Sequence, residues 1–351
     1  MSDTTERAAA RPAGTGAAAG TEHFAETGAR AQSPWPTGPS GSKRILLVND
    51  MAGYGKVALS AMIPILSHLR HQVFNLPTAL VSNTLDYGTF DILETTGYMR
   101  NAIAAWDELG FEFDAVATGF LVSQEQARLV ADFCRARREA GARVFVDPIM
   151  GDDGCLYNGV PASTVDVMRE ACGAADVIMP NLTEALLLAG RDAKAAEPGA
   201  GGLAREDAEA LARELHALGP RSVVVTSCLV DGAHVTLVSE AGSLELLPYD
   251  EVPVRFPGTG DIFSAVLIGD VLAGRPLAEA TRHAMDVVRD LLLLNERNED
   301  RFKGIPVELY LDRIAAGAPA EVARRAQASA RGAGASLADT APREGAARHG
   351  A

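Results

Sequence analysis

The chain of 351 residues carries a formal net charge of −14, and 47% of its residues are hydrophobic. This composition supports one large core or two small ones. The acidic balance argues against nucleic-acid and anionic-membrane partners, because both attract surfaces rich in Lys and Arg. No apolar run approaches the roughly 20 residues of a membrane-spanning helix. Four scattered cysteines without a CxxC pair predict reduced thiols in a cytoplasmic protein.

Two tails flank the part of the chain that has structure-forming patterns. Residues 1–42 are rich in Ala, Gly, Thr, Ser and Pro without apolar periodicity, and residues 318–351 read the same way. Such segments bury too little surface to offset the entropy of ordering, so we expect both to be disordered. The first tail also lacks the apolar stretch of a secretory signal. Residues 43–317 are predicted to form one domain.

Between the tails, short apolar or β-branched runs alternate with helical patterns. In chain order we expect a strand at 45–48, a helix at 57–69, a strand pair or one bent strand at 73–76 and 79–82, a helix at 98–109, a strand at 115–118, a helix at 123–140, a strand at 143–146, a helix at 162–172, a strand at 177–179, a helix at 206–218, a strand at 222–226, a hairpin at 235–238 and 244–247, and helices at 261–272 and 277–294. This alternation predicts a three-layer α/β/α sandwich around a mostly parallel sheet.

Polar or glycine-rich residues follow the predicted strands. These segments are 49–55, 83–87, 119–120, 147–152, 180–184 and 226–227. Ligands of open α/β sheets bind outside the carboxyl ends of the strands, so the segments should converge on one edge of the sheet. Asp147, Asp152 and Glu184 can meet there. Clustered carboxylates favour a cation, and Mg²⁺ bound to nucleotide phosphates needs only a few protein oxygens.

The run Gly258-Thr259-Gly260-Asp261 precedes an apolar helical stretch. Glycines at a helix start let backbone N–H groups face a bound anion, and the helix dipole adds partial positive charge. The run therefore predicts an anion hole for a transferring phosphoryl group. Asp261 at its mouth could accept the proton of an attacking hydroxyl, a role that contributes roughly 10²- to 10⁴-fold to a rate.

The same four residues also suit a plain turn, because Asp is a favoured N-cap and Gly-Thr-Gly a common turn sequence. The ordered set of motifs is more specific than any one of them. Asp-Pro-x-x-Gly-Asp at 147–152 comes first, Pro-Asn-x-x-Glu at 180–184 follows, and Gly-Thr-Gly-Asp comes last. This set favours an ATP-dependent small-molecule kinase.

In these motifs, residues 43–294 resemble the ribokinase-like superfamily, and specifically its pyridoxal/pyridoxamine kinases, with hydroxymethylpyrimidine kinases as near relatives. The segments 49–55 and 76–79 are similar to the pyridoxamine-kinase branch. The resemblance implies a ribokinase-like fold and ATP-dependent phosphorylation of the 5′-hydroxymethyl group of pyridoxal, pyridoxamine and pyridoxine. It also implies Mg²⁺, a monovalent cation such as K⁺, and a homodimer.

The resemblance further implies a role for each matching residue. Asp261 is expected to be the catalytic base, with Gly258, Thr259 and Gly260 as the anion hole. The residues expected around ATP are Asn181, Asp147, Thr226 and Ser227, together with Gly258 and Gly260; Asp147 and Thr226 would also lie near the monovalent cation. The residues expected around magnesium are Asp152, Glu184 and Tyr157. The residues expected around the vitamer are Asp50, Ser82, Leu85, Phe120 and Asp261.

Five positions depart from the family pattern. Thr84 stands where the family often has His. Leu85 stands where the family often has a Thr whose hydroxyl would contact substrate. Met179 stands where a Thr often helps to hold a cation, and Cys155 where Lys is common. Pro257 replaces the Cys of a subclass that bonds the aldehyde. These changes bear on substrate or ion preference and leave the phosphoryl-transfer motifs intact.

Two other functions remain open from the sequence. A hydroxymethylpyrimidine kinase is compatible with Leu85 and Met179. A non-catalytic vitamer-binding regulator belongs to a different class, and the intact Gly-Thr-Gly-Asp and acidic motifs argue against it.

Overall fold

The computed structural model describes residues 41–157 and 160–316, so the predicted disorder of the tails falls almost wholly outside the described residues. Their centre is a nine-stranded sheet in the order β11-β10-β9-β8-β5-β4-β1-β2-β3. The five pairs within β2-β1-β4-β5-β8-β9 are parallel, and β3, β10 and β11 pair antiparallel at the two ends. The prediction of a mostly parallel sheet is confirmed.

The strands are β1 Arg44–Tyr54, β2 Gln72–Asn83, β3 Ile92–Glu94, β4 Ala115–Thr118, β5 Arg143–Val146, β6 Gly151–Asp152, β7 Cys155–Leu156, β8 Val177–Ile178, β9 Ser222–Val230, β10 Ala233–Glu240 and β11 Ser243–Pro248. The helices are α1 Ala58–His68, α2 Thr96–Leu109, α3 Gln124–Glu139, α4 Thr164–Gly173, α5 Leu182–Leu188, α6 Arg205–Ala217, α7 Thr259–Leu272, α8 Leu277–Asn295 and α9 Leu311–Ala316. Short 3₁₀ turns lie at Leu85–Tyr87, Ala193–Ala196 and Val307–Leu309.

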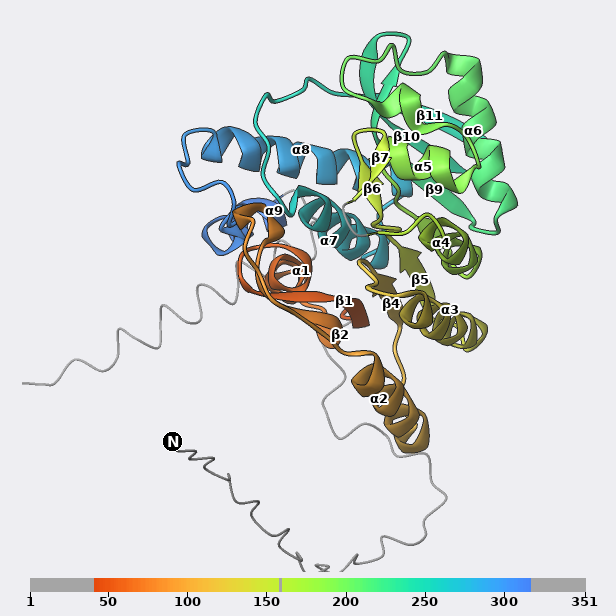
Figure 1. The fold of residues 1–351 in the computed structure, drawn as a ribbon, viewed down its shortest axis with the longest axis vertical. Coiled ribbons are helices and arrows are strands. Elements are labelled where there is room, and N and C mark those ends of the chain that lie inside the picture. Colours follow the sequence, from red (N-terminus) through yellow and green to blue (C-terminus); the bar gives the residue numbers. More distant parts are fainter. Residues whose placement is uncertain (1–40, 158–159, 317–351) are drawn as a thin grey trace, which may run out of the picture. The chain divides into compact units, whose positions relative to one another are not determined.

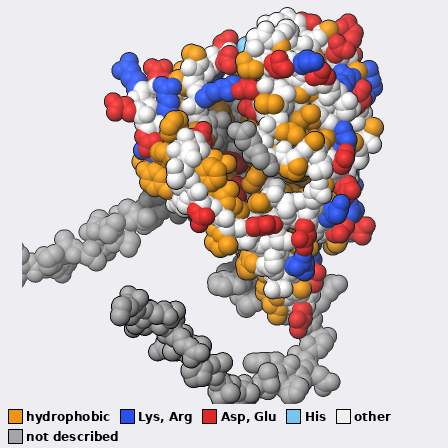
Figure 2. Space-filling view, viewed as in Figure 1, with side chains coloured by type: hydrophobic (Ala, Val, Ile, Leu, Met, Phe, Trp, Pro, Cys, Tyr) orange, Lys and Arg blue, Asp and Glu red, His pale blue; other side chains and the backbone are white. Residues whose placement is uncertain are grey.

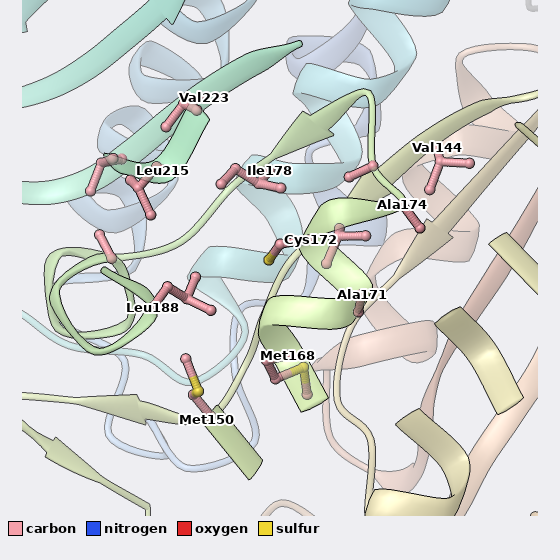
Figure 3. Close-up of a cluster of buried hydrophobic side chains, with 14 of the residues drawn as sticks. Val144, Met150, Met168, Ala171, Cys172, Ala174, Ile178, Leu188, Leu215 and Val223 are labelled. Carbon is pink, nitrogen blue, oxygen red and sulfur yellow. The ribbon is translucent and has the colours of Figure 1, made fainter. Parts of the chain in front are cut away.

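Helices cover both faces of the sheet (Figure 1). Side chains alternate along each strand, so Ile45 and Leu47 of β1 face one layer while Leu46 and Val48 face the other. The first layer contains α1, α7, α8 and α9, and the second contains α2 to α6. Figure 3 shows the second layer, where Ile178 and Val223 of the strands meet Cys172 of α4. Both faces are therefore apolar, as buried parallel strands require.

The first two strands are longer than the sequence suggested. β1 continues to Tyr54, because residues 51–54 stay paired with β2 after an irregularity between Asn49 and Met51. Expecting a loop to begin at Asn49 was therefore wrong, since most of the segment 49–55 is strand. The two expected runs 73–76 and 79–82 form the single strand β2, and Pro77 lies within it.

Several short elements were not predicted from the sequence. The edge strand β3, the hairpin β6–β7 and the helices α5 and α9 carry too few residues for a clear periodicity. The hairpin β10–β11 was predicted correctly. It turns at Ala241 and Gly242, whose φ values of 51° and 83° match a two-residue turn with positive φ at both positions.

The cysteines behave as expected, with all four as free thiols and three of them buried. In the described part of the chain, no helix combines the length and the apolar character that crossing a bilayer requires.

Candidate functional site

The start of α7 lies at one edge of the sheet, where Asp261 bonds to Asn49 of β1 and Ser264 bonds to Asp147, which follows β5. Figure 2 shows a hollow on the viewed face, in the region where Figure 1 draws the start of α7 beside the hairpin β6–β7. Of the residues predicted for the site, Asp50 of β1, Asp147 after β5, Glu184 of α5 and Asp261 of α7 are linked by charges that affect their ionisation.

Asp261 lies in the first turn of α7, and both of its oxygens have partners. Oδ2 accepts a hydrogen bond from the Ala58 N–H at 2.7 Å, and Oδ1 accepts one from Asn49 Nδ2 at 3.4 Å. Burial raises the pKa of Asp261 to about 6, although these two donors oppose the rise. The carboxylate is therefore oriented by its partners and titrates close to neutral pH.

Two contributors to this geometry were missed from the sequence. Ala58, the first residue of α1, has φ of 48°, in the left-handed region that an Ala side chain rarely adopts. Asn49 is buried, and its Oδ1 accepts from the backbone N–H groups of Asp50 and of Phe120, at 3.0 and 2.8 Å. A single amide thus joins the irregular middle of β1, the loop after β4 and Asp261.

Gly119 is required by this arrangement. A Cβ atom at Gly119 would lie between 2.4 and 2.6 Å from the side-chain atoms of Asn49. From the sequence, Gly119 was interpreted only as part of a segment that follows a predicted strand, while Phe120 was expected near the vitamer. The function of Gly119 in the fold is to leave room for the amide that holds Asp261.

A second group of carboxylates lies around β5, β6 and α5. Asp147 Oδ2 accepts a hydrogen bond from Ser264 Oγ of α7 at 3.0 Å, and burial followed by the charge of Asp261 raises the pKa of Asp147 to about 7. Burial, and then the charge of Asp147, raises the pKa of Glu184 well above its usual value. Burial also raises the pKa of Asp152. Asp147 and Glu184 therefore interact, whereas the charges that act on Asp152 are those of Asp153 and Arg255, so the meeting of all three carboxylates stays a prediction.

Glu184 is held in place by backbone donors. Its oxygens accept from the N–H groups of Met150 at 3.0 Å, Gly151 at 3.4 Å and Asn181 at 2.9 Å. Asn181 caps α5 in return, accepting from the Glu184 N–H at 2.9 Å and donating to the Gly151 carbonyl at 2.8 Å. This capping box fixes the β6–β7 hairpin to the start of α5. Asn181, predicted to contact ATP, and Glu184, predicted to contact magnesium, therefore both make hydrogen bonds within the protein.

Tyr157 follows the hairpin and is 44% exposed. Burial raises the pKa of Tyr157, and the charges of Glu184, Asp152, Asp147 and Asp261 raise it further, in that order. A cation in this region would relieve the repulsion among the carboxylates. Within residues 41–157 and 160–316, however, no three His, Cys, Asp or Glu side chains are close enough together to hold a metal by themselves. The donor set therefore fits a Mg²⁺ ion that takes most of its oxygens from phosphates and water.

The predicted anion hole has the backbone that the sequence suggested. Gly258 precedes α7 with φ of 84°, and a Cβ there would lie 2.3 Å from the Lys56 carbonyl oxygen. Gly260 has open space around it, and its N–H is among the first four of the helix, which have no intrahelical acceptor. The Thr259 hydroxyl donates to the Phe256 carbonyl at 3.3 Å. Only glycine fits at position 258, while position 260 leaves the helix end accessible.

Thr226 and Ser227 lie in the middle of β9, next to the capping box. The Thr226 N–H donates to the Pro180 carbonyl at 3.0 Å, and Thr226 pairs with Asn181 through an isolated bridge. Ser227 is exposed and has φ of 58°. β9 is thus irregular at the point that lies beside α5.

The residues predicted around the acceptor divide into two pairs. Burial, and then the charge of Asp261, raises the pKa of Asp50 to about 7, and Phe120 is tied to Asn49, so both lie near Asp261. The described hydrogen bonds of Ser82 are with Asn83 and Asp91, in the connection from β2 to β3. Leu85 is 50% exposed in the 3₁₀ turn after β2. The second pair thus comes from the end of β2 and the turn that follows it.

Comparisons with known proteins agree with this geometry. The family model described as phosphomethylpyrimidine kinase matches residues 76–300. A pyridoxal kinase of Paraburkholderia xenovorans is 30% identical over 263 residues, which cover 70% of this chain and 86% of that protein.

Solved structures give the same result. A crystal structure from Bacteroides thetaiotaomicron, named for a phosphomethylpyrimidine kinase and determined with pyridoxal, is 35% identical with a TM-score of 0.70, covering 78% of this chain and 96% of that one. The pyridoxal kinase of Leishmania donovani in complex with ADP and pyridoxamine is 26% identical with a TM-score of 0.66, covering 77% of this chain and 95% of that one. The resemblance noted in the sequence is confirmed, and the chain belongs to the phosphomethylpyrimidine kinase family, with the ribokinase-like fold of its pyridoxal kinases.

Proposed function

We propose that this protein transfers the γ-phosphoryl group of ATP to the 5′-hydroxymethyl group of pyridoxal, pyridoxamine or pyridoxine. The observation that carries the proposal is the Asp261 carboxylate, held at the start of α7 by the Ala58 N–H and Asn49. The relatives named as pyridoxal kinases, and those solved with pyridoxal or with ADP, support the acceptor and ATP as the phosphoryl donor.

In this proposal Asp261 is the general base. A carboxylate with a pKa near 6 is mostly ionised at neutral pH and is still basic enough to accept a hydroxyl proton in the transition state. The N–H groups at the start of α7, with Gly258, Thr259 and Gly260, would stabilise the charge that develops on the transferring phosphoryl group. Catalysis is then mainly positioning and electrostatic stabilisation.

Mg²⁺ would neutralise phosphate charge when bound with ATP. We propose that its protein contacts lie in the region of Asp152, Glu184 and Tyr157, where burial raises the pKa of both carboxylates. ATP would lie along β8 and β9, near Asn181, Asp147, Thr226 and Ser227. The assignment of K⁺ near Asp147 and Thr226 stays a prediction.

The vitamer would lie near Asp50 and Phe120, with Ser82 contributing from the end of β2 and Leu85 from the turn after it. We also place the enzyme in the cytoplasm, where its four free thiols would remain reduced.

A panel of alcohols tests the substrate. With purified protein, ATP and Mg²⁺, we expect ADP release with at least one B6 vitamer at a higher kcat/KM than with hydroxymethylpyrimidine, measured by a coupled assay. Preference for the pyrimidine would favour the alternative kinase. Vitamer binding without turnover of any alcohol would favour the non-catalytic regulator.

Replacement of the base tests the mechanism. Asp261→Asn keeps the size of the side chain but cannot accept a proton, so turnover should fall at least about 10²-fold. ATP binding, measured by calorimetry, should be largely unchanged. Asp132→Asn, at an exposed carboxylate of α3, is the control and should keep wild-type turnover. Full activity of Asp261→Asn would refute the assigned base.

The pH profile follows from the raised pKa. Because the base must be unprotonated, kcat/KM should rise with pH through an apparent pKa near 6 and fall off at lower pH. Measuring the profile with two vitamers whose rings titrate differently separates the enzyme group from the substrate. A flat profile between pH 5 and 8 with both would contradict the assignment.

We further propose that the protein is a homodimer that pairs through the β2–β3 end of the sheet. All three residues of β3 are exposed, and Phe74, Leu80, Ile92, Leu93 and Tyr98 present an apolar surface there. An exposed apolar edge strand is otherwise an aggregation hazard.

Charge placed on this edge tests the dimer. The wild-type protein should sediment at about twice the chain mass of 36.8 kDa, and Leu93→Lys should sediment as a monomer. Leu309→Lys, at a residue that is 74% exposed in another part of the chain, should leave the mass unchanged. A monomeric wild-type protein at micromolar concentration would exclude this interface.

A further inference from the structure

The segment 300–306, which we call the C-terminal strap, contacts two segments of the site. The Lys303 carbonyl accepts a hydrogen bond from the Lys56 N–H at 2.7 Å, next to the turn that leads to Ala58. The Phe302 carbonyl accepts one from the Thr84 hydroxyl at 2.6 Å, in the loop after β2. The family match ends at residue 300, the first residue of the strap, so residues 301–306 lie beyond the part of the chain that the family model matches.

The strap fits closely against the site. A Cβ atom at Gly304, whose φ is 78°, would lie 2.8 Å from the Lys56 carbonyl oxygen and 3.0 Å from that of Pro257, the residue before Gly258. A cavity of about 250 Å³ is lined by residues of β1 and α1 on one side and by Lys303, Gly304 and Pro306 of the strap on the other. The strap therefore connects the surroundings of the base with the loop that follows β2.

Thr84 is the buried contact of that loop with the strap. It is 3% exposed, and its methyl group fills the space left by Gly55, where a Cβ would lie 2.3 Å from Thr84 Cγ2. Thr84 stands at one of the positions where the sequence departs from the family pattern. Its hydroxyl is used to hold Phe302.

Aromatic side chains extend the same contact. The rings of Tyr87 and Phe302 meet edge to face at 5.6 Å, and Tyr54 lies 6.0 Å from Tyr87. The Tyr87 hydroxyl donates to Asp300 Oδ1 at 2.8 Å. The loop thus meets the strap through two side-chain hydrogen bonds and a ring contact, with Leu85 between the two hydrogen-bonding residues.

We propose that Thr84 is a positioning residue for the acceptor: its hydrogen bond to the Phe302 carbonyl holds the loop 84–87 against the C-terminal strap, and this lock sets the affinity for the acceptor alcohol. The proposal rests on the proposed function, since it takes the loop as one wall of the acceptor site. ATP is expected on the other side of the site, along β8 and β9, so the lock should not affect its binding.

Two variants of Thr84 separate the hydroxyl from the methyl group. Thr84→Val keeps the shape but leaves the Phe302 carbonyl without its donor, and a buried hydrogen bond left unmade corresponds to about 5- to 100-fold in an equilibrium. We expect Thr84→Val to raise KM for the vitamer at least about 5-fold. The ATP KM and kcat should stay within about twofold. Thr84→Ser keeps the hydroxyl and should restore the acceptor KM.

A control and a second variant keep the test decisive. Thr281→Val removes another buried Thr-to-carbonyl hydrogen bond, in α8, and should leave the acceptor KM unchanged. If Thr84→Val does not fold, Gly304→Ala displaces the strap and should raise the acceptor KM instead. Gly274→Ala is the control for Gly304→Ala, because Gly274 also has a positive φ, of 94°, but no atom lies close to its Cβ position.

Hydrogen exchange of peptides spanning 84–90 and 300–306 measures, without any substrate, how firmly the loop is held against the strap. Exchange should be faster in both peptides of Thr84→Val and near wild type in Thr84→Ser. If wild-type protein phosphorylates no alcohol, the proposed function fails while this readout still decides the lock. An unchanged acceptor KM in an active Thr84→Val, or a raised KM without faster exchange in the strap, would overturn the proposal.

Discussion

Four carboxylates lie at the carboxyl edge of the sheet, with Glu184 buried and the other three half-buried, and their mutual repulsion is the constraint on which the site depends. Asp50, Asp147, Glu184 and Asp261 all have raised pKa values, with burial as the largest cause. Folding therefore favours their protonated forms. For Asp50 and Asp147, whose pKa values are raised to about 7, this contribution to stability is fully present below pH 4 and is lost as the pH rises to about 7. At neutral pH the free protein thus carries an electrostatic cost that a bound cation would offset.

Backbone N–H groups are the main donors that make this cost tolerable. Glu184 accepts from three of them and Asp261 from one, so much of the compensation comes from the ends of strands and helices. Asn49 adds a neutral side chain that connects three segments without adding charge. The same groups fold the edge of the sheet and orient the carboxylates, so the site and the local fold depend on the same contacts.

The sequence predicted site residues that belong to short motifs. It did not predict contacts that join distant parts of the chain. The motifs around Asp147, Glu184 and Asp261 could be assigned to one sheet edge, because parallel strands place their carboxyl ends together. The contacts of Ala58 and Asn49 with Asp261 span more than 200 residues, and no spacing in the sequence reveals them. α5 could have been found, since Asn181 and Glu184 have the Asn-x-x-Glu spacing of a capping box.

Ala58 has a consequence for how such a site can evolve. Its left-handed backbone is unfavourable for any residue with a Cβ, and glycine at this position would remove a strain on the order of 1 kcal/mol. A glycine would also allow the peptide to rotate and take the N–H away from Asp261. Glycine at position 58, although less strained, would thus leave the base less firmly oriented. An unstrained backbone therefore favours Gly at position 58, whereas a firmly oriented base favours a residue with a Cβ, and the chain has Ala58.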